Sequence, residues 1–479
     1  MFLRRFYNEP LAQASYMLGC QATGVAVVVD PNRDTTQYHA AAREESVRIT
    51  HVTETHIHAD YLSGSRQLAR ETGAQILLSA EGGSAWQYAF ARDDGAVLLR
   101  EGDRFEVGAV RLDVLHTPGH TPEHLTFLVT DTAVADEPLG ALTGDFIFVG
   151  DVGRPDLLER AAHVAGTMEA SARELHRSLR RFAALPDYLQ LWPGHGAGSA
   201  CGKALGAMPQ STLGYEKLAN WAFAIDDEDE FVEQVLAGQP DPPTYFAMMK
   251  RLNREGPALL ARRPSPSEEA SGALAGVLGE GDVVVDLRSA DAFRAGHVPG
   301  TLSIPFGRSF AGWAGWLLPY ERDIHLIAAG TGEAARTQAE RAAVDLSLIG
   351  IDRVRGYFEE DALESWERER GALETVTDVD AETLEEKLRR GAVQLIDVRA
   401  RSEWEAGRIG GARNIPLGDI AAQARTIADT GPVVVQCASG ARSTIASSIL
   451  MANGVRDVIN LRGGLAAWRD AGLAVTDSE

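Results

Sequence analysis

The C-terminal part of the chain repeats one pattern, and this repeat restricts the possible folds more than any other feature. The first copy contains Val283-Val-Val-Asp286-Leu-Arg288, Gly296-His-Val-Pro-Gly300 and Ile304-Pro305. The second copy contains Leu395-Ile-Asp397-Val-Arg399, Gly407-Arg-Ile-Gly-Gly411 and Ile415-Pro416, so that the Asp, Gly and Pro recur 111 positions later. Two copies of one small domain of strands and helices are the simplest explanation.

The length of 479 residues leaves room for about three domains, and the composition changes along the chain mark their limits. In the first 200 residues, strand-like runs at 24–30, 47–53, 75–79, 110–115, 125–130 and 188–192 alternate with helix-like patterns at 60–72 and 157–185. A helical, acidic extension follows, and the acidic run at 226–230 is interpreted as a helix start. A Pro- and Ser-containing linker at 262–269 precedes the repeat. We expect domains at 1–260, 268–372 and 376–479.

The net charge and the cysteine content limit which binding partners and which cellular compartment we expect for this protein. The net charge of −22 disfavours a nucleic-acid partner, and no apolar run reaches the roughly 20 residues that a membrane span needs. Glu9 and Pro10 interrupt any signal-peptide core. The three cysteines, Cys20, Cys201 and Cys437, are far apart and odd in number, which favours free thiols in a reducing compartment. We expect a cytoplasmic protein without nucleic-acid or membrane partners.

A group of histidines and carboxylates in the first domain has the pattern of a metal site. His56, His58 and Asp60 stand together just after the strand-like run at 47–53. Three later motifs, Thr117-Pro-Gly-His120, Thr143-Gly-Asp145 and Trp192-Pro-Gly-His195, each combine a strand end with a turn that contains glycine. Neutral imidazole and carboxylate are ligands that suit zinc or iron, and loops at strand ends can bring them together.

In this order, the four motifs resemble the metallo-β-lactamase-like family, and within it glyoxalase II and the persulfide dioxygenases. The resemblance covers roughly residues 1–260 and implies an α+β fold, the αββα sandwich. In the persulfide dioxygenase branch, the residues that match His56, His120 and Asp145 hold one Fe(II) per chain. Such a 2-His-1-carboxylate triad leaves three positions for O₂ and a thiolate. Zn²⁺ is the alternative metal.

Tyr61 departs from the two-metal pattern of this family, which has another histidine at that place. A phenol with a pKa near ~10 is a poor ligand for a divalent ion at neutral pH. We therefore expect His58, Asp60, Tyr61 and His195 to orient ligands or water by hydrogen bonding. A weak second metal site that uses some of these side chains is the alternative.

Arg154, Asp156 and Cys201 are candidates for substrate binding. Arg154 lies in Gly150-Asp-Val-Gly-Arg154-Pro-Asp156, shortly after Asp145, where a guanidinium suits a carboxylate or phosphate of the substrate. In the resembling family, an arginine at this place helps to hold the thiol carrier. A salt bridge between Arg154 and Asp156 is the alternative. Cys201 could face the metal pocket, and a buried structural thiol is the alternative.

The second copy of the repeat carries a candidate nucleophile. Cys437 follows the strand-like run 433–436 and precedes a helical pattern, so backbone N–H groups and the positive helix end would stabilise a thiolate. Arg442 adds positive charge, and the loop that would bind sulfur contains Ala438, Ser439, Gly440, Ala441 and Ser443. This loop resembles the rhodanese active-site loop, and Gly463-Gly-Leu-Ala-Ala-Trp468 matches that family's closing motif. Arg442 follows Cys437 by five positions, which is the spacing in sulfurtransferases. Phosphatases of related fold have one more residue in this loop.

The first copy has Ala328-Ala-Gly-Thr331 at the equivalent loop and no cysteine anywhere in residues 265–375. The resemblance therefore implies two α/β rhodanese-like domains, of which 268–372 is inactive and 376–479 is active. We expect the inactive copy to position the active one or to form a contact in a homo-oligomer.

Together, the resemblances predict a persulfide dioxygenase fused to a sulfurtransferase. The substrates would be a low-molecular-weight thiol persulfide and O₂, the product sulfite, and Cys437 would pass sulfane sulfur to sulfite to give thiosulfate. A zinc-dependent, glyoxalase II-like thioester hydrolase with an attached sulfurtransferase is the first alternative. A sulfur relay with a vestigial metal domain is the second.

Overall fold

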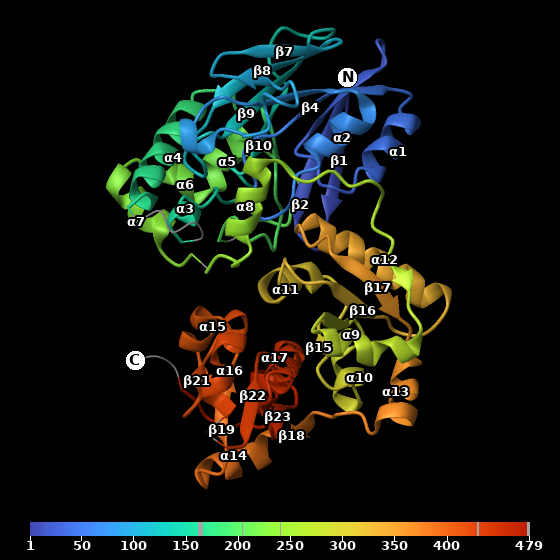
Figure 1. Ribbon diagram of the computed structural model, residues 1–479. Coiled ribbons are helices and arrows are strands. Elements are labelled where there is room, and N and C mark those ends of the chain that lie inside the picture. The colour runs from blue at the N-terminus through green and yellow to red at the C-terminus, as the bar shows by residue number, and fades with distance from the viewer. Residues whose placement is uncertain (161–165, 204, 240, 429–430, 477–479) are drawn as a thin grey trace. The chain divides into compact units, whose positions relative to one another are not determined.

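The computed structural model describes residues 1–160, 166–203, 205–239, 241–428 and 431–476, and it divides into two compact units (Figure 1). The first unit comprises Met1–Arg263 with Ser347–Gly350. The second comprises Pro264–Leu346 and Ile351–Glu479. The division after Arg263 falls within the linker expected at 262–269.

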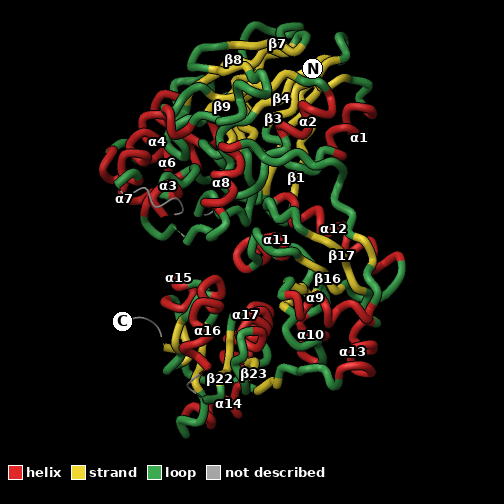
Figure 2. Tube along the Cα trace, viewed as in Figure 1, coloured by secondary structure: helices red, strands yellow, loops and turns green. Residues whose placement is uncertain are grey.

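The first unit contains two six-stranded sheets, seen as two groups of yellow strands in Figure 2. The first sheet has the order β1-β2-β3-β4-β5-β6, with β1(Phe2–Asn8), β2(Gln13–Cys20), β3(Val25–Val29), β4(Arg48–Thr53), β5(Gln75–Ser79) and β6(Val97–Leu99). The second has the order β12-β11-β10-β9-β8-β7, with β7(Arg104–Val107), β8(Val110–His116), β9(Leu125–Asp131), β10(Gly140–Gly144), β11(Gln190–Pro193) and β12(Ser211–Thr212).

The alternation of side chains along the strands explains why the two sheets pack face to face. Phe127 and Val129 of β9 belong to a core that also contains Leu18 and Val27 of the first sheet. Leu128, between them, points to the opposite face and packs with the helices there. Strand side chains alternate in this way, so each sheet has one face in the shared core and one face that a helix must cover.

Helices cover both outer faces. α1(Thr36–Glu44) and α2(Ser65–Thr72) pack on the first sheet, and α4(Met168–Phe182) and α7(Glu228–Leu236) pack on the second. The described part of this unit also contains α3(Leu157–Arg160), α5(Leu213–Ala219), α6(Trp221–Ala224), α8(Phe246–Glu255) and the short 3-10 helix η1(Ser84–Trp86). The expected αββα sandwich is confirmed.

Most expected elements of this unit are present, with differences at their ends. α2 begins at Ser65, five residues later than expected, because residues 60–64 form the loop that carries site residues. The expected helix at 157–185 consists of α3 and α4, which ends at Phe182 before Pro186, and residues 161–165 lie outside the described part. The acidic run begins α7 as expected, since the Asp227 carboxylate accepts the backbone N–H of Glu230 at 2.9 Å.

The second unit contains two five-stranded sheets with equivalent strand orders, β13-β17-β16-β14-β15 and β18-β23-β22-β19-β21. The strands of the first are β13(Ser267–Glu268), β14(Val283–Asp286), β15(Leu302–Ser303), β16(Ile324–Ile327) and β17(Val354–Phe358). Those of the second are β18(Thr377–Val379), β19(Gln394–Asp397), β21(Arg413–Asn414), β22(Val433–Gln436) and β23(Val458–Leu461), and β20(Arg408–Ile409) pairs with β24(Val475–Thr476). The repeat in the sequence thus corresponds to two sheets of one topology.

Helices flank both sheets. The first copy has α9(Leu274–Glu280), α10(Ala290–Ala295), α11(Phe310–Leu317), α12(Glu333–Leu348) and α13(Ala362–Arg370). The second has α14(Ala381–Arg389), α15(Arg401–Glu405), α16(Ile420–Ala428), α17(Ala441–Ala452) and α18(Gly464–Asp470).

A buried ion pair accounts for the repeated Asp, Arg and Gly. In the second copy, the Arg399 guanidinium contacts the Asp397 carboxylate at 2.6 Å and donates to the Gly407 carbonyl at 2.8 Å. In the first copy, Arg288 contacts Asp286 at 2.7 Å and the Gly296 carbonyl at 2.9 Å. The repeated residues therefore tie the end of one strand to the turn after the next helix.

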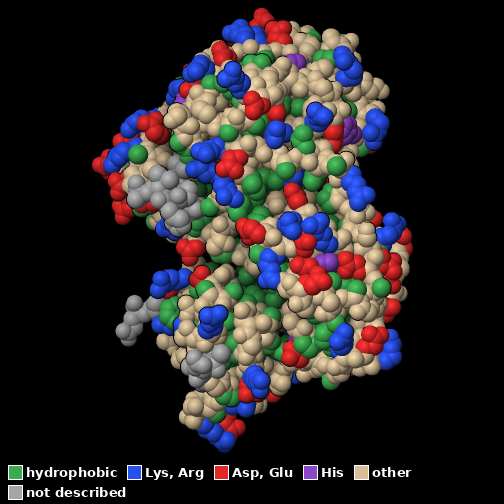
Figure 3. Space-filling model, in the orientation of Figure 1, with side chains coloured by type: hydrophobic (Ala, Val, Ile, Leu, Met, Phe, Trp, Pro, Cys, Tyr) green, Lys and Arg blue, Asp and Glu red, His purple; other side chains and the backbone are tan. Residues whose placement is uncertain are grey.

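No helix in the described part of the chain combines the length and the apolar character needed to cross a membrane. On the face drawn in Figure 3, acidic and basic side chains of the described residues are interspersed.

Candidate metal centre and sulfur-binding loop

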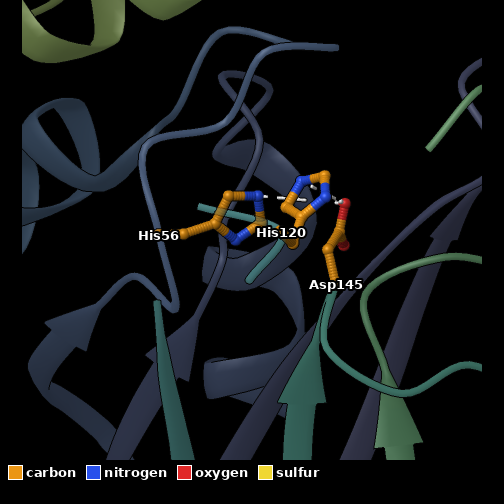
Figure 4. Close-up of side chains that lie close together, drawn as sticks. All are labelled: His56, His120 and Asp145. Atoms are coloured by element: carbon orange, nitrogen blue, oxygen red, sulfur yellow. Dashed lines mark ion pairs between the residues drawn. The ribbon is translucent and has the colours of Figure 1, made fainter. Parts of the chain in front are cut away.

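Three separate segments bring His56, His120 and Asp145 together. His56 follows β4, His120 lies in the turn between β8 and β9, and Asp145 follows β10. One ligand atom from each lies within 4.8 Å of the others, and all three side chains are buried. Figure 4 shows the two imidazoles and the carboxylate directed toward one another.

Hydrogen bonds to the protein fix which imidazole nitrogen faces the group. His120 Nδ1 lies 3.0 Å from the Arg154 carbonyl, and donation to it leaves Nε2 for the interior, 3.5 Å from Asp145 Oδ2. His56 Nδ1 lies 2.9 Å from the Thr55 hydroxyl, and its Nε2 is 3.8 Å from the same carboxylate oxygen. This pattern, with one nitrogen held and one free, is usual for histidines that bind metals.

Three atoms of this group lack hydrogen-bond partners, and this observation tests whether a metal fits. His56 Nε2 and both oxygens of Asp145 are buried without a hydrogen-bond partner among the described residues, although the Nε2 atoms of His120 and His195 lie 3.5 and 3.4 Å from Asp145 Oδ2. Burying a carboxylate in this way is costly unless a cation compensates it. Burial, together with the neighbouring imidazoles, holds the pKa of His56 well below its ordinary value, and burial lowers the pKa of His120. Neutral imidazoles beside a carboxylate fit a divalent metal ion.

His58 and Tyr61 face Asp30 instead of this group. His58 Nε2 lies 3.1 Å from Asp30 Oδ1, and the Tyr61 hydroxyl donates to the Asp30 carbonyl at 3.1 Å. Burial opposes protonation of His58, but the nearby Asp30 charge raises the pKa to about 9. Burial raises the pKa of Tyr61 above its ordinary value, so the phenol stays neutral. Both arrangements are compatible with the orienting roles expected from the sequence.

Asp60, His195 and Cys201 form a second buried group next to the first. His195 Nε2 is 3.2 Å from Asp60 Oδ2 and 3.4 Å from Asp145 Oδ2. Burial works against a charged His195, but Asp145 and Asp60 raise its pKa well above the ordinary value. Burial raises the pKa of Cys201 to about 12. The three side chains bring one ligand atom each within 4.8 Å of the others, as a weak second metal site requires, and the contact between His195 and Asp60 is the kind that an orienting role uses.

Arg154 is fully buried and paired within the protein. Its Nε and Nη2 bind the two oxygens of Asp156 at 2.8 and 2.7 Å, and Nη1 donates to the Ala200 carbonyl at 3.2 Å. This geometry favours the salt bridge that the sequence left as the alternative. Since the Arg154 carbonyl also accepts from His120, the pair fixes the loop behind a predicted ligand.

The loop after β22 places Cys437 at the start of α17. The sulfur atom is buried and accepts the backbone N–H of Gly440 at 3.1 Å. The Ser443 hydroxyl is 3.6 Å from the sulfur. Gly440 has a φ of 107°, and this left-handed conformation turns its N–H inward. Ser439 and Ala441 are exposed at the rim. The expected strand–loop–helix environment of Cys437 is thus present.

The closing motif packs directly on this loop. Leu465 N–H donates to the Cys437 carbonyl at 2.8 Å, and Ala466 N–H donates to the Ala438 carbonyl at 3.1 Å. A Cβ at Gly464 would lie 2.3 Å from the Cys437 carbonyl oxygen, so only glycine permits this approach.

Arg442 pairs with a carboxylate of the same copy. Its guanidinium binds both oxygens of Glu403, at 2.6 and 2.8 Å, in a bidentate pair. The sequence analysis missed Glu403, which belongs to α15 and is remote in sequence. The sequence marks Glu403 only as a glutamate three residues after Ala400 at the helix start, where its carboxylate accepts the Ala400 N–H.

The equivalent loop of the first copy is occupied by side chains of the same copy. Ala329 N–H donates to Gln338 Oε1 at 2.7 Å, and Gly330 N–H donates to Glu360 Oε2 at 2.7 Å. Gly332 N–H donates to Glu359 Oε1 at 2.6 Å. The Gln338 amide oxygen and two carboxylates therefore occupy three of the backbone N–H groups in this loop.

Sequence reasoning also missed Asp30 and Asn460. Asp30 accepts the Thr55 N–H at 2.6 Å and contacts His58, so it holds the loop that bears His56. Asn460 Oδ1 accepts the Ser443 hydroxyl at 2.6 Å. Asp30 could have been suspected as a carboxylate at a strand end before a proline, whereas Asn460 carries no such signal.

The αββα sandwich with its buried His–His–Asp group defines the class of protein, and comparisons with known proteins agree. A model of the metallo-beta-lactamase superfamily matches residues 8–195, and a model of the rhodanese-like domain matches residues 380–471, the second copy. The crystal structure of a metallo-beta-lactamase from Staphylococcus aureus subsp. aureus COL is 41% identical, with a TM-score of 0.66. The match covers 75% of this chain and 99% of that one. The chain belongs to the metallo-beta-lactamase superfamily and carries a C-terminal rhodanese-like domain.

Two further relatives match part of the chain. Persulfide dioxygenase ETHE1, mitochondrial, from Bos taurus is 26% identical over 197 residues, which cover 41% of this chain and 68% of that protein. A hydroxyacylglutathione hydrolase from Rhodospirillum rubrum is 29% identical over 180 residues, which cover 38% of this chain and 60% of that protein. The chain thus spans less than two thirds of the Rhodospirillum relative.

Proposed function

We propose that the protein is a persulfide dioxygenase coupled to a sulfurtransferase. The first domain oxidises a low-molecular-weight thiol persulfide: R–S–SH, O₂ and H₂O give R–SH, HSO₃⁻ and H⁺. The last domain transfers sulfur: a Cys437 persulfide anion and SO₃²⁻ give the Cys437 thiolate and S₂O₃²⁻. The S–S bond of the Cys437 persulfide breaks as the new S–S bond of thiosulfate forms.

The observation that carries the proposal is the set of three ligand atoms around a common centre, from His56, His120 and Asp145. Tyr61 supports it, because the phenol is buried against Asp30 where a hydrolase would use an imidazole. A ferrous ion held by such a triad supplies free coordination positions for O₂ and the substrate sulfur. The similarity to persulfide dioxygenase ETHE1 points in the same direction.

The side chains around the triad have defined tasks in this proposal. Thr55 and the Arg154 carbonyl hold His56 and His120 so that each presents Nε2. Asp30 keeps His58 oriented beside the triad, and Asp60 with His195 holds a proton next to Asp145. The buried position of the group restricts bulk water around it.

In the sulfur-transfer domain, the Gly440 N–H and the start of α17 stabilise the sulfur anion on Cys437. Arg442, fixed by Glu403, adds positive charge at the rim, where sulfite would approach. Joining the two domains in one chain raises the effective concentration of sulfite to roughly the millimolar range if the linkage permits transfer.

A zinc-dependent thioester hydrolase is the second candidate. The group of Asp60, His195 and Cys201 next to the triad favours it, since these side chains are also able to hold a metal. The hydroxyacylglutathione hydrolase relative favours it as well.

Metal content and O₂ uptake of anaerobically purified protein distinguish the two candidates. The dioxygenase proposal expects one iron per chain and O₂ consumption with persulfides of glutathione, coenzyme A or other small thiols. One or two zinc ions per chain, hydrolysis of S-acyl thiols and no O₂ uptake would favour the hydrolase.

A further inference from the structure

The cysteine-less copy contacts the groups that shape the Cys437 loop, and one arginine makes these contacts. Arg294 lies on α10 of the first copy, and its side chain is 13% exposed. Its Nη1 donates to the Thr444 hydroxyl on α17 at 2.7 Å, and its Nε is 3.3 Å from Asp378 Oδ1 on β18. Arg294 and these two partners lie in one compact unit, and Thr444 and Asp378 belong to the second copy, whereas Asp291, the third partner of Arg294, lies on α10 itself.

The first connection leads from Arg294 to the loop backbone. Since the Thr444 hydroxyl accepts from Arg294, its hydrogen is directed to the Gly440 carbonyl, 3.0 Å away. Gly440 is the residue whose N–H binds the Cys437 sulfur. Its left-handed conformation therefore has a support that begins in the other copy.

The second connection leads to the hydroxyl beside the sulfur. Asp378 Oδ1 accepts from Asn460 Nδ2 at 2.7 Å, so Asn460 turns its carbonyl oxygen toward Ser443. The Ser443 hydroxyl lies 2.6 Å from that oxygen and 3.6 Å from the Cys437 sulfur. The hydroxyl has a second acceptor in the Gly440 carbonyl at 3.0 Å, and the orientation of the Asn460 amide supplies the shorter of its two hydrogen bonds.

We propose that Arg294 is a positioning residue for sulfur transfer, and that the cysteine-less copy braces the Cys437 loop through it. The two connections end at Gly440 and Ser443, the two residues that contact the Cys437 sulfur at 3.1 and 3.6 Å. This inference rests on the proposed sulfurtransferase function and adds a residue from outside the active copy. A brace of this kind acts on the thiolate through geometry, because the polar partners of Arg294 in the described part of the chain are Asp291, Asp378 and Thr444, and not Cys437.

Alkylation of Cys437 by iodoacetamide, followed by peptide mass spectrometry on the full chain, tests the proposal without any need for sulfur transfer. For Arg294→Ala, the midpoint of the curve of alkylation rate against pH should move to higher pH. The alkylation rate of Cys437 at pH 7 should fall about threefold to tenfold, the range typical of substitutions in such networks. Arg336→Ala is the matched control, since this arginine of the first copy pairs with Glu333 and Glu340 on its own helix.

A double-variant comparison separates a network from general loss of stability. Thr444→Val removes only the first connection. Arg294→Ala should therefore lower the alkylation rate of Cys437 less in the Thr444→Val variant than in the native protein. Arg294→Lys, which keeps the charge and the stem, should restore part of the rate, and it serves as the test if Arg294→Ala does not fold. A curve of alkylation rate against pH that is unchanged in Arg294→Ala would overturn the proposal. Unchanged curves in both single variants, Arg294→Lys and Thr444→Val, would do the same.

Activity assays keep this result distinct from the proposed function. Native protein without thiosulfate sulfurtransferase activity would contradict the proposed function, whereas the alkylation curve alone decides the role of Arg294.

Discussion

At the scale of single residues, the metal group is defined by the positions of its ligand atoms. His120 has Nδ1 on a carbonyl and turns Nε2 to the group, whereas His58 has Nε2 on Asp30 and keeps Nδ1 without a hydrogen-bond partner among the described residues. Both are buried histidines in loops after strands with one nitrogen held, so neither residue type nor hydrogen bonding distinguishes them. The distinction is that the ligand atoms of His56, His120 and Asp145 lie within 4.8 Å of one another.

Removal of His120 should abolish oxidation without disturbing sulfur transfer. For His120→Ala, we expect iron content and O₂ uptake to fall by about 100-fold or more, since one of three ligand atoms is lost. Transfer of sulfur from thiosulfate to cyanide by Cys437 should remain near the native rate. His116→Ala is the control, because His116 binds the Pro122 carbonyl and lies outside the group. Undiminished O₂ uptake in His120→Ala would contradict the ligand assignment.

Glu123 should make stability depend on pH. Burial raises the pKa of Glu123 to about 7, from an ordinary value of 4.5. Between these values the folded protein keeps a proton that the unfolded chain releases, so this residue's contribution to stability falls as pH rises from about 4.5 to about 7. Above that range the contribution should stay constant.

The variant Glu123→Gln should remove this dependence, since the amide oxygen can still accept the Ile57 N–H. The free energy of unfolding in urea, compared between native protein and variant at pH 5, 6, 7 and 8, should favour the variant increasingly up to pH 7. Glu106→Gln, at an exposed position, is the control. A difference that does not change with pH would refute the prediction.

At the scale of elements, α18 is joined to the Cys437 loop by backbone contact. Gly464→Ala should separate them, because its Cβ would lie 2.3 Å from the Cys437 carbonyl oxygen. We expect a loss of about 1–3 kcal/mol in the free energy of unfolding, together with slower sulfur transfer.

Gly472→Ala is the matched control, since Gly472 has a φ of 69° but nothing within 4 Å of its Cβ position. It should lose only about 1–2 kcal/mol, the usual cost of a left-handed residue, and keep its sulfur transfer rate. Equal rates of sulfur transfer for Gly464→Ala and Gly472→Ala would show that the contact between Gly464 and the Cys437 loop does not affect sulfur transfer.

The sequence predicted elements well where the pattern is local. The strand at 75–79 and the strand–loop–helix around Cys437 follow from alternation, from short apolar runs and from glycine placement. β1 and β2 were missed, because the polar residues of β1, such as Arg4 and Arg5, hide its strand character. The equivalence of the two sheets in the second unit was expected from the repeat alone.

The candidate sites were predictable in their ligand types but not in their supports. His56, His120 and Asp145 carry motifs that can be recognised in the sequence. Glu403 and Asn460 act through contacts between elements remote in sequence, 39 and 17 positions from their partners Arg442 and Ser443. Such pairings become visible only when the fold places the elements side by side.

At the scale of the whole molecule, the proposal divides oxidation and sulfur transfer between two units. Cys437→Ser should leave O₂ uptake with a persulfide unchanged and shift the product from thiosulfate to sulfite, as quantified by chromatography of the sulfur anions. Cys20→Ser, which removes a buried thiol from the first unit, is the control. A loss of O₂ uptake in Cys437→Ser would count against this division of labour.

The self-bonded loop of the first copy has a consequence for any thiol placed in it. Ala328 is the counterpart of Cys437, and the backbone N–H groups of Gly330 and Gly332 in its loop are bound by the Glu360 and Glu359 carboxylates. Two negative charges beside the loop disfavour a third, so the thiol of Ala328→Cys should ionise less readily than an ordinary cysteine. Iodoacetamide should therefore alkylate it more slowly than Cys437 at neutral pH, and an equal rate would contradict this prediction.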